Sequence, residues 1–584
     1  MMNNCCEEMV FEGVEVLKPL PLLKKIRVKS PNTDSVEKIQ KEFNFSPLTA
    51  RVLAARGFEA GEELRSFLDS TLRSDLPHPD KLKNLSEACL ILKEGLERGK
   101  TIAICCDFDV DGLSSGAMLK TFFSEIGIEA KVFVPDRFTE GYGLNKRMID
   151  EVVDEGCGIL LALDFGSTNY SELLYAKERD LITIVIDHHH LGTKPLEVDS
   201  FINPEQEGCG FSDLQLCAAG LTWYFIAALR TFLPQAAAVD VRDYLEFSCL
   251  GTICDMVPLL GANRVIAKRG MERLNTTQRV GLRALLNVSG VKKNLSATDI
   301  SFGVGPRINA AGRMSSGEMV IELLTTSDRK RADSLANKLD RLNAERQDLE
   351  KKIKKEVAFR ISLMTRLPYG IVVGDKSFHT GVVGIVAQRI AETFYRPTAI
   401  IGSDENGVFK GSCRGIKGFN VVEALKNCAD YLLGYGGHVG AGGFSLDEKN
   451  ISAFSIAFNN EAERQLSPDD LFPICEVDTV ADLSELTPKI IDELAIFTPY
   501  GIGNPAPVIL LKNLRIVETF TLKSTHLKAL VSDGKRTLPA LLWNQTSHPA
   551  IKRGGVVNLA CRPTLNSFNG LLEIQLQIQG AEAV

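Results

Sequence analysis

The segment TIVIDHHHL, residues 183–191, decides the fold prediction for this chain. Its first four residues are apolar and mostly β-branched, which is typical of a strand buried on both faces of a parallel sheet. The run then ends in one carboxylate and three imidazoles, Asp187 and residues 188–190. In an open α/β sheet the functional crevice lies beyond the carboxyl ends of the strands. The segment therefore predicts a metal site at a strand end; the alternative is a polar loop with incidental histidines.

A second acidic segment follows an earlier apolar run, residues 101–105, which has the composition of a buried strand. Directly after it, Asp107, Asp109 and Asp111 alternate along the chain. If this segment stays extended, the three carboxylates lie on one side. Three like charges so close are costly without a cation, and the later ligands of an EF-hand are missing, which favours Mg²⁺ or Mn²⁺. Gly112 permits a tight turn into a helix that we predict from residue 114 to residue 126.

Strand-like and helix-like segments alternate along this part of the chain. The further apolar runs are residues 130–134, 159–163 and 182–186, separated by helical patterns at 146–155 and 169–178. Such alternation predicts a parallel sheet with right-handed crossovers, so the strand ends should meet at one edge. Asp164 follows one of these runs and should join the acidic and imidazole groups there.

A lone carboxylate, Asp255, lies in the apolar segment GTICDMVPL, residues 251–259. Burying an unpaired carboxylate among apolar neighbours is costly, and a metal ion is one partner that removes this cost. We therefore predict that Asp255 belongs to the same site. The alternative is an exposed aspartate in a turn.

The composition indicates a multidomain globular protein. The chain has 584 residues, of which 45% are hydrophobic and 24% are charged, and a single core rarely grows so large. The net charge of −7 gives no global basic surface, so any nucleic-acid contact must come from local patches. The 14 cysteines form no CxxC pair, and neither a membrane-spanning run nor a signal peptide is evident, which predicts a cytoplasmic protein with reduced thiols.

Together these residues resemble the DHH phosphoesterase superfamily, and within it the single-strand-specific 5′→3′ exonucleases. The aspartate triple, Asp164, the Asp187-His188-His189 run and Asp255 follow the superfamily's order and spacing. Other segments that carry the resemblance are FGVGPRINAAGR (302–313), GSCR (411–414), GGH (436–438) and AGG (441–443). The resemblance implies a metal-dependent exonuclease that hydrolyses phosphodiester bonds of single-stranded DNA in DNA repair and recombination. It also implies two Mn²⁺ or Mg²⁺ ions as cofactors.

The resemblance assigns roles to individual residues. The implied catalytic residues are Asp107, Asp109, Asp111, Asp164, His188, His189 and Asp255. All except His189 are implied metal ligands, with Asp107 either bound to a cation or one shell removed, whereas His189 would face the scissile phosphate. The implied substrate-binding residues are Arg137, Asn203, Arg307, Asn309, Arg313, Ser412, Arg414 and His438, of which Arg137, Arg313, Ser412 and Arg414 would anchor a 5′-phosphate.

Two positions depart from the superfamily pattern. Cys105 stands where many members have a histidine two residues before the first aspartate. We therefore expect Cys105 to be only a buried strand residue and Asp107 to lie nearer the metal. Phe378 replaces the tryptophan that precedes a histidine in the second domain, a change that we expect to alter packing more than charge.

The expected architecture is α/β: two α/β domains, a parallel-sheet DHH domain and a DHHA1 domain, joined by a long helix and followed by a C-terminal OB-like β-barrel. Residues 327–364 contain no glycine or proline and carry an apolar stripe, which predicts a connecting helix that packs on a domain rather than a coiled coil. The predicted divisions are an N-terminal segment (1–80), the DHH catalytic domain (81–316), the connecting helix (317–366), the DHHA1 domain (367–466) and the OB-like single-strand-binding domain (467–584).

Two segments of the DHHA1 domain, residues 411–414 and 435–438, are expected to be glycine-rich loops in which backbone N–H groups approach a phosphate. The tail has short strand-like runs between turns at residues 533–534 and 569–570, the pattern of a small five-stranded barrel. Basic and aromatic residues that would bind a single strand there are Lys523, Lys528, Lys535, Arg536, Trp543 and Phe568.

Two other functions stay open from the sequence. A phosphodiesterase for nanoRNA or cyclic dinucleotides, or a DHH-type pyrophosphatase, would use the same site, although such relatives are generally shorter and lack the barrel. A non-catalytic scaffold would be expected to lose the metal carboxylates that this chain keeps. From the resemblance alone we expect single-strand-binding protein and a RecQ-like helicase as partners and a monomeric chain. No membrane partner is expected.

Overall fold

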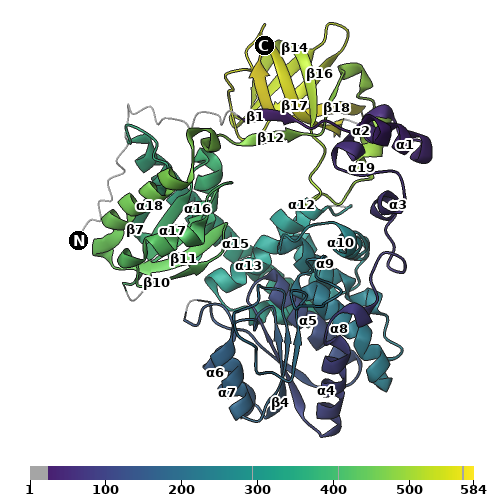
Figure 1. The fold of residues 1–584 in the computed structure, drawn as a ribbon, viewed down its shortest axis with the longest axis vertical. Coiled ribbons are helices and arrows are strands. Elements are labelled where there is room, and N and C mark those ends of the chain that lie inside the picture. The colour runs from purple at the N-terminus through teal and green to yellow at the C-terminus, as the bar shows by residue number, and fades with distance from the viewer. Residues whose placement is uncertain (1–23, 138, 292–293, 405–406, 569–570) are drawn as a thin grey trace. The chain divides into compact units, whose positions relative to one another are not determined.

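The structure is a computed structural model that describes residues 24–584 except residues 138, 292–293, 405–406 and 569–570 and the side chains of residues 567, 568 and 571. The chain forms two compact units (Figure 1). The first, called here the parallel-sheet unit, consists of Lys29–Arg346 and Ser484–Val508. The second, called the barrel unit, consists of residues 24–28 at its described N-terminal part, Gln347–Leu483 and Ile509–Val584.

A five-stranded sheet in the order β3-β2-β4-β5-β6 is the centre of the parallel-sheet unit, and all neighbouring strands run parallel. Its strands are β2 (Thr101–Cys106), β3 (Ala130–Phe133), β4 (Cys157–Leu163), β5 (Ile182–Ile186) and β6 (Ser200–Ile202). Helices cover both faces, α6 (Lys146–Asp154) and α7 (Tyr170–Glu178) on one and α4 (Leu85–Glu97), α5 (Val110–Glu125) and α8 (Ala218–Phe232) on the other (Figure 1). The predicted parallel sheet is therefore confirmed.

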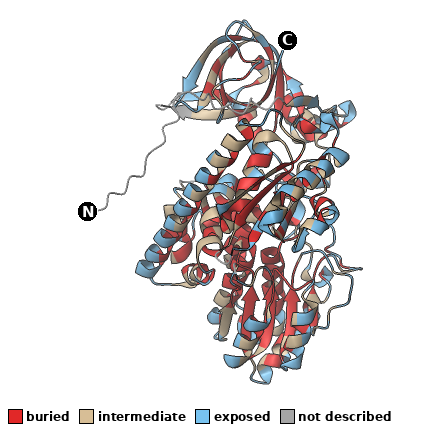
Figure 2. Cartoon of the chain, turned by 90° about the vertical axis from the view of Figure 1, so that its left-hand side faces the viewer, coloured by how far each residue is buried: buried red, intermediate tan, exposed pale blue. Residues whose placement is uncertain are grey.

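Successive residues of each strand enter two different hydrophobic cores. In β2, Ile102 and Ile104 pack with α4, α5 and α8, whereas Ala103 and Cys105 pack with α6 and α7. Figure 2 shows these strands as the buried centre of their unit. Because both faces are covered, the strands are apolar without polar alternation. Cys105 is fully buried and serves as a strand residue in the α6–α7 core.

Further helices complete the parallel-sheet unit. They are α1 (Thr33–Phe43), α2 (Pro47–Ala55), α3 (Glu62–Leu68), α9 (Leu245–Cys254), α10 (Gly261–Leu274), α11 (Val280–Val288), α12 (Ala297–Asp299), α13 (Gly305–Met314), α14 (Glu318–Thr325) and α19 (Pro488–Ala495). A π-helical turn, Ile300–Val304, precedes α13.

The predicted long helix is present as α15 (Arg329–Ser362), and its apolar stripe divides between two cores. Leu335 and Leu339 pack in the largest core of the parallel-sheet unit. Ile353 and Val357 pack in a core of the barrel unit. Each half of the helix is thus stabilised by the unit to which it belongs.

The barrel unit contains a five-stranded mixed sheet in the order β10-β11-β9-β8-β7. Its strands are β7 (Ile371–His379), β8 (Thr398–Ser403), β9 (Phe409–Arg414), β10 (Gly434–Gly437) and β11 (Ala441–Leu446), with helices α16 (Thr380–Phe394), α17 (Val421–Asn427) and α18 (Ile451–Gln465). The expectation that residues 411–414 and 435–438 are loops was wrong, since they lie mainly in β9 and β10. Gly411 is required by packing instead, because a Cβ there would clash with the ring of Phe444.

The C-terminal strands close into the predicted five-stranded barrel. They are β14 (Ile509–Leu522), β15 (His526–Ser532), β16 (Thr537–Leu542), β17 (Val556–Phe568) and β18 (Leu571–Ala583), and pairing of β14 with β17 completes the closure. Strand β13 (Thr479–Ala481) adds to β14, and β1 (Lys25–Val28) pairs with β12 (Ile474–Val477). The predicted turn at residues 569–570 lies outside the described residues. No helix in the described part of the chain is both long and apolar enough to span a membrane.

Candidate active site

Three carboxylates lie in one row at the carboxyl edge of the parallel sheet. Asp107, Asp164 and Asp187 directly follow the last residues of β2, β4 and β5, which are register partners of one another. The ladder continues past these ends, because the N–H of Asp164 donates to the carbonyl of Ile186 at 3.0 Å. Parallel pairing therefore brings together residues that are far apart in sequence.

Asp109 and Asp111 are placed by helix starts rather than by an extended strand. Asp109 is the N-cap of α5, and its Oδ1 accepts from the backbone N–H of Asp111 at 2.9 Å. Asp111 lies in the first turn of α5, where its carboxylate accepts from the N–H groups of Ala218 (2.7 Å) and Ala219 (2.9 Å) at the start of α8. The segment does not stay extended, so the condition for placing the three carboxylates on one side is not met. The predicted helix start at residue 114 was wrong, because the Asp109 cap starts α5 at Val110.

Two glycines allow this close assembly. A Cβ at Gly112, inside α5, would lie 2.5 Å from the carbonyl oxygen of Asp107, so this residue is required by close approach and not by a turn. A Cβ at Gly251 of α9 would clash with a carboxylate oxygen of Asp111. The carboxylate loops are therefore packed too tightly for any side chain at these two positions.

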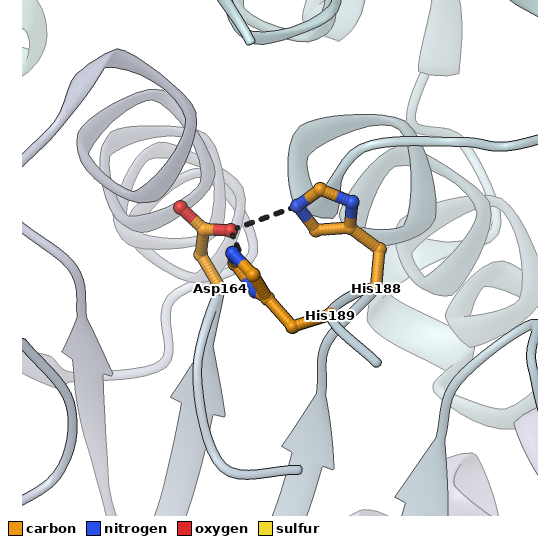
Figure 3. A group of neighbouring side chains, drawn as sticks. All are labelled: Asp164, His188 and His189. Atoms are coloured by element: carbon orange, nitrogen blue, oxygen red, sulfur yellow. Dashed lines mark ion pairs between the residues drawn. The ribbon is translucent and has the colours of Figure 1, made fainter. Parts of the chain in front are cut away.

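His188 lies at the centre of the acidic cluster. Its Nε2 is 3.2 Å from Asp164 Oδ1, 3.6 Å from Asp255 Oδ2 and 3.8 Å from Asp111 Oδ2. Figure 3 shows the His188 and His189 rings next to each other, both facing the same oxygen of the Asp164 carboxylate. Asp164 itself has a left-handed backbone with φ 66°, a conformation that aspartate and asparagine tolerate better than most residues. The structure thus brings together the carboxylates and imidazole that the sequence pointed to.

His189 is held by Asp187, which the sequence did not single out as a ligand. Asp187 is buried, accepts from the N–H groups of Ser167 (2.9 Å) and His188 (2.8 Å), and lies 2.8 Å from Nδ1 of His189. Burial opposes ionisation of Asp187, but the His189 and Ser167 hydrogen bonds hold its pKa well below the usual range. Burial also disfavours the charged form of His189, but Asp187 raises the pKa of His189 to about 9. This shift favours the positively charged form of His189.

His190 does not join the cluster. Its side chain is exposed and its Nδ1 lies 2.6 Å from a carboxylate oxygen of Glu205. Of the three consecutive histidines, only the first two face the carboxylates.

The buried carboxylates repel one another. Burial, followed by the charges of neighbouring carboxylates, raises the pKa of Asp107 and Asp164 well above the usual range and that of Asp255 to about 9. Three buried atoms here, Asp107 Oδ1, Asp164 Oδ1 and His188 Nε2, have no hydrogen-bond partner. Unpaired buried polar atoms and like charges are costly, and a divalent cation removes both costs.

The donor set fits such cations. Two groups with ligand atoms within 4.8 Å of one another are Asp107, Asp109 and Asp164, and Asp111, His188 and Asp255. A third group combines Asp164, His188 and His189, but Nδ1 of His189 is already held by Asp187. Carboxylate oxygen with one imidazole suits Mg²⁺ or Mn²⁺.

Helix α13 carries the FGVGPRINAAGR motif and packs against both acidic loops. A Cβ at Gly305 would lie 2.6 Å from Sγ of Cys254, which precedes Asp255, and a Cβ at Gly312 would lie 3.0 Å from the carbonyl oxygen of Phe108. The two glycines are seven residues apart and so lie on one face of the helix. This contact explains why the motif is rich in small residues.

Two predicted substrate residues of this unit lie next to the acidic loop. The Arg137 guanidinium is 4.9 Å from the ring centre of Phe108, between Asp107 and Asp109 in sequence. Burial lowers the pKa of Arg137, whereas Asp107 and Asp109 raise it. Arg313 follows Gly312 on α13 and is half-buried.

The other predicted substrate residues of this unit make contacts within the protein or lie on α13. Asn203 is fully buried and donates to Ser167 Oγ and to the carbonyl of His189, both at 2.9 Å. Arg307 donates to Asp340 at 2.9 Å and to a backbone carbonyl at 2.7 Å. Asn309 is half-buried on α13. Asn203 thus fixes the loop that carries His189.

The remaining predicted substrate residues lie in the barrel unit at one end of its mixed sheet. Arg414 of β9 donates to Ser412 Oγ at 2.8 Å, and Gly384 of α16 adjoins both, since a Cβ there would lie 3.2 Å from each side chain. His438 is exposed and its N–H donates to the carbonyl of Ala441, the register partner of Arg414. This sheet end therefore places Ser412 and Arg414 beside α16, with His438 in the turn between β10 and β11.

Tyr142 is a site residue that the sequence gave no reason to select. Its hydroxyl donates to the carbonyl of Asp164 at 2.8 Å and lies 3.0 Å from Nδ1 of His189. The ring meets the His189 imidazole edge-on, with 5.4 Å between centres. It lies in a polar loop without secondary structure, where only the fold shows which strand ends it contacts.

Family models match three successive parts of the chain. The DHH family N-terminal domain matches residues 101–252, the DHHA1 domain matches residues 366–464 and the RecJ OB domain matches residues 477–580. The parallel sheet with its acidic edge, the mixed sheet and the closed barrel thus define a DHH-family protein with an appended DHHA1 domain and OB barrel.

Full-length relatives narrow this class. The chain is 32% identical to the single-stranded-DNA-specific exonuclease RecJ of Bacillus subtilis, over 95% of this chain and 70% of that protein. It is 30% identical to RecJ of Escherichia coli over 91% of this chain and 95% of that protein. The solved structure of Mn²⁺-bound RecJ from Thermus thermophilus superposes with a TM-score of 0.82 at 30% identity, over 96% of this chain and 79% of that one. The chain belongs to the RecJ family.

A Mg²⁺ complex of the Thermus thermophilus protein also matches, with a TM-score of 0.76 at 28% identity over 96% of this chain and 78% of that one. This one relative thus has structures with each of the two cations for which the donor set of this chain is suited.

Proposed function

We propose that this chain is a metal-dependent exonuclease that hydrolyses single-stranded DNA from the 5′ end, in DNA repair and recombination. Membership of the RecJ family makes it a single-stranded-DNA-specific exonuclease. The observation that carries the chemistry is the cluster of buried carboxylates around His188. The 5′ polarity and the repair role go beyond this observation and are the proposed part.

Six residues would hold two Mn²⁺ or Mg²⁺ ions. Asp107, Asp109 and Asp164 are the proposed ligands of one cation, and Asp111, His188 and Asp255 those of the other. When bound, the two cations supply an activated water and neutralise the charge that develops in an in-line displacement at phosphorus.

The chain's own groups orient the substrate. Asp187 fixes the His189 ring and keeps it protonated, so His189 is proposed to donate to an oxygen of the scissile phosphate. Asn203 supports this arrangement by holding the His189 carbonyl, and Tyr142 covers one edge of the ring. These contacts would hold the protonated His189 ring at the place of the reacting phosphate before the substrate binds.

Single-strand binding and 5′ anchoring are assigned to side chains of both units. Arg137 and Arg313 in the parallel-sheet unit, and Ser412 and Arg414 in the barrel unit, are the proposed 5′-phosphate ligands, because guanidinium groups bind phosphate oxygens in pairs. Asn309 and His438 are proposed to contact the strand, whereas Asn203 would act by holding the His189 loop and Arg307 by joining α13 to α15. Exposed residues of the barrel, above all Trp543, Lys523 and Lys535, suit stacking and phosphate contact, whereas Lys528 is half-buried. Phe568 has no described side chain.

The test is degradation of a single strand labelled at either end, with Mn²⁺ or Mg²⁺ and with a duplex control. Stepwise release from a 5′-phosphorylated end, abolished by a chelator and slow on duplex, is the expected result. Release from the 3′ end would refute the proposed polarity. Turnover of dinucleotides without attack on long strands would refute the exonuclease and favour a small-substrate phosphodiesterase.

Several further assignments are proposals that rest on the family alone. They are binding of single-strand-binding protein and of a RecQ-like helicase, a monomeric state, a cytoplasmic location, and domain boundaries at residues 80, 316, 366 and 466. Pull-down with each partner and the mass of the chain in solution are the measurements that decide the first three.

A further inference from the structure

A loop from the C-terminal third of the chain packs against the segment that carries Asp255. Segment Ser484–Val508 falls within the residues matched by the RecJ OB domain, yet it belongs to the parallel-sheet unit. Within it, residues 500–504 form a small loop closed by a bridge between Gly501 and Asn504. The N–H of Leu259 donates to the carbonyl of Ile502 in this loop at 2.8 Å.

The contact leaves no free space for a Cβ at either of the two glycines of the loop. A Cβ at Gly503, which has φ 72°, would lie 3.0 Å from Cβ of Pro258. A Cβ at Gly501 would lie 2.6 Å from Cδ1 of Leu259. Pro258 and Leu259 are three and four residues after Asp255, so the loop packs against the residues that follow this carboxylate in the chain.

Two buried polar side chains hold the loop in place. Asn504 donates to the carbonyls of Phe497 (2.7 Å) and Pro499 (2.8 Å). Arg264 of α10 is buried and donates to the carbonyls of Phe497 and Thr498, both at 2.9 Å. Helix α10 follows the Asp255 segment in the chain. The same helix therefore also holds residues 497 and 498, which precede the loop.

We propose that residues 500–504 are a clamp that positions Asp255 for the cation shared with Asp111 and His188. The other side of the Asp255 segment is already fixed by α13, where Gly305 abuts Cys254. Met256, between the two supports, is 65% exposed with φ 62°, so the residue next to Asp255 is not itself held by packing. The clamp therefore sets the affinity of one metal site. In sequence, it lies just before β14, the first strand of the barrel. This inference rests on the proposed metal role of Asp255.

The test is Mn²⁺ binding to the full chain, measured by electron paramagnetic resonance of free Mn²⁺, for three variants. Gly503→Ala introduces a Cβ against Pro258, and Gly290→Ala is the matched control, because Gly290 has φ 69° and nothing within 4 Å. We expect Gly503→Ala to raise the Kd of one of two Mn²⁺ sites about 10-fold, as changes to groups that support metal ligands do. Gly290→Ala should leave both sites unchanged. Asp255→Asn should remove the same site.

Each outcome decides one claim. If Asp255→Asn binds two Mn²⁺ as the wild type does, the metal role of Asp255 fails and the clamp proposal fails with it. If Asp255→Asn loses a site but folded Gly503→Ala keeps both affinities, the clamp alone is overturned. Melting of each variant without metal reports folding, and Gly501→Ala, which has no left-handed strain, repeats the test should Gly503→Ala not fold.

Discussion

The edges of the two α/β sheets are built in opposite ways. At the edge of the parallel sheet, acidic groups are buried, crowded and partly unpaired, as Asp107 and Asp164 show. In the mixed sheet of the barrel unit, the edge strand β10 is exposed along its whole length and glycine-rich, and Arg414 lies at the end of β9, on the far side of β11. The first edge attracts cations, and the second is suited to a polyanion.

In the proposed function, the parallel-sheet edge carries out the reaction and the mixed-sheet edge holds the substrate. Buried carboxylates favour metal ions because solvent cannot screen their repulsion. A glycine-rich edge lets backbone N–H groups approach phosphate closely, and an arginine in the same sheet adds positive charge. Changes at the first edge should therefore lower kcat, whereas changes at the second should raise KM.

The largest effect is expected from Asp164→Asn. Asparagine keeps the shape and tolerates the left-handed backbone, but it removes a charge from both groups that contain Asp164. We expect a loss in kcat on the order of 1000-fold, because cations contribute several kcal/mol to the transition state, with single-strand binding retained. Initial rates on a labelled strand measure this effect. The control is Asp180→Asn, an exposed aspartate with φ 57°. Normal turnover by Asp164→Asn would refute its role as a ligand.

A smaller and different effect is expected from Arg414→Ala. Loss of a charge-assisted bond to phosphate, worth about 1.5–3 kcal/mol, should raise KM for 5′-phosphorylated strands about 10- to 100-fold with kcat little changed. Strands with a 5′-hydroxyl should be unaffected. Arg389→Ala, on α16 of the same unit, is the control. An equal loss on both kinds of end would contradict 5′-phosphate anchoring by Arg414.

The smallest effect is the pH dependence of stability without metal. The folded chain raises the pKa of Asp255 from 3.8 and that of His189 from 6.5, each to about 9. Groups with raised pKa values bind protons more tightly when folded, so their stabilisation is lost as pH rises towards 9. The Tm in chelator should therefore fall between about pH 5 and pH 9, by about 2–4 °C per kcal/mol lost. Mg²⁺ should reduce this fall, whereas a metal-free Tm that rises over this range would contradict the electrostatic account.

The sequence was sufficient for the strands and for the meeting of their ends. Apolar runs bounded by acidic residues predict β2, β4 and β5, and parallel pairing then places Asp107 and Asp164 together. It failed where a local cap competed with strand extension, since Asp109 starts a helix two residues after Asp107. The sequence also failed to predict β9. A glycine usually indicates a turn, and only the structure shows that Gly411 is needed because the Phe444 ring packs on it.

Long-range contacts were beyond prediction for a different reason. Nothing in the segment around Gly503 distinguishes a loop that packs on Pro258 from a loop within the barrel that follows it. Tyr142 likewise acquires its role only when the ends of β4 and β5 are adjacent. Such contacts depend on the whole fold and carry no local pattern.

The most direct test of the two-cation site is anomalous X-ray scattering from crystals of the full chain soaked in Mn²⁺. The account expects two peaks about 3.5–4 Å apart, one bounded by Asp107, Asp109 and Asp164 and the other by Asp111, His188 and Asp255. Peaks elsewhere, or none at these carboxylates, would contradict it.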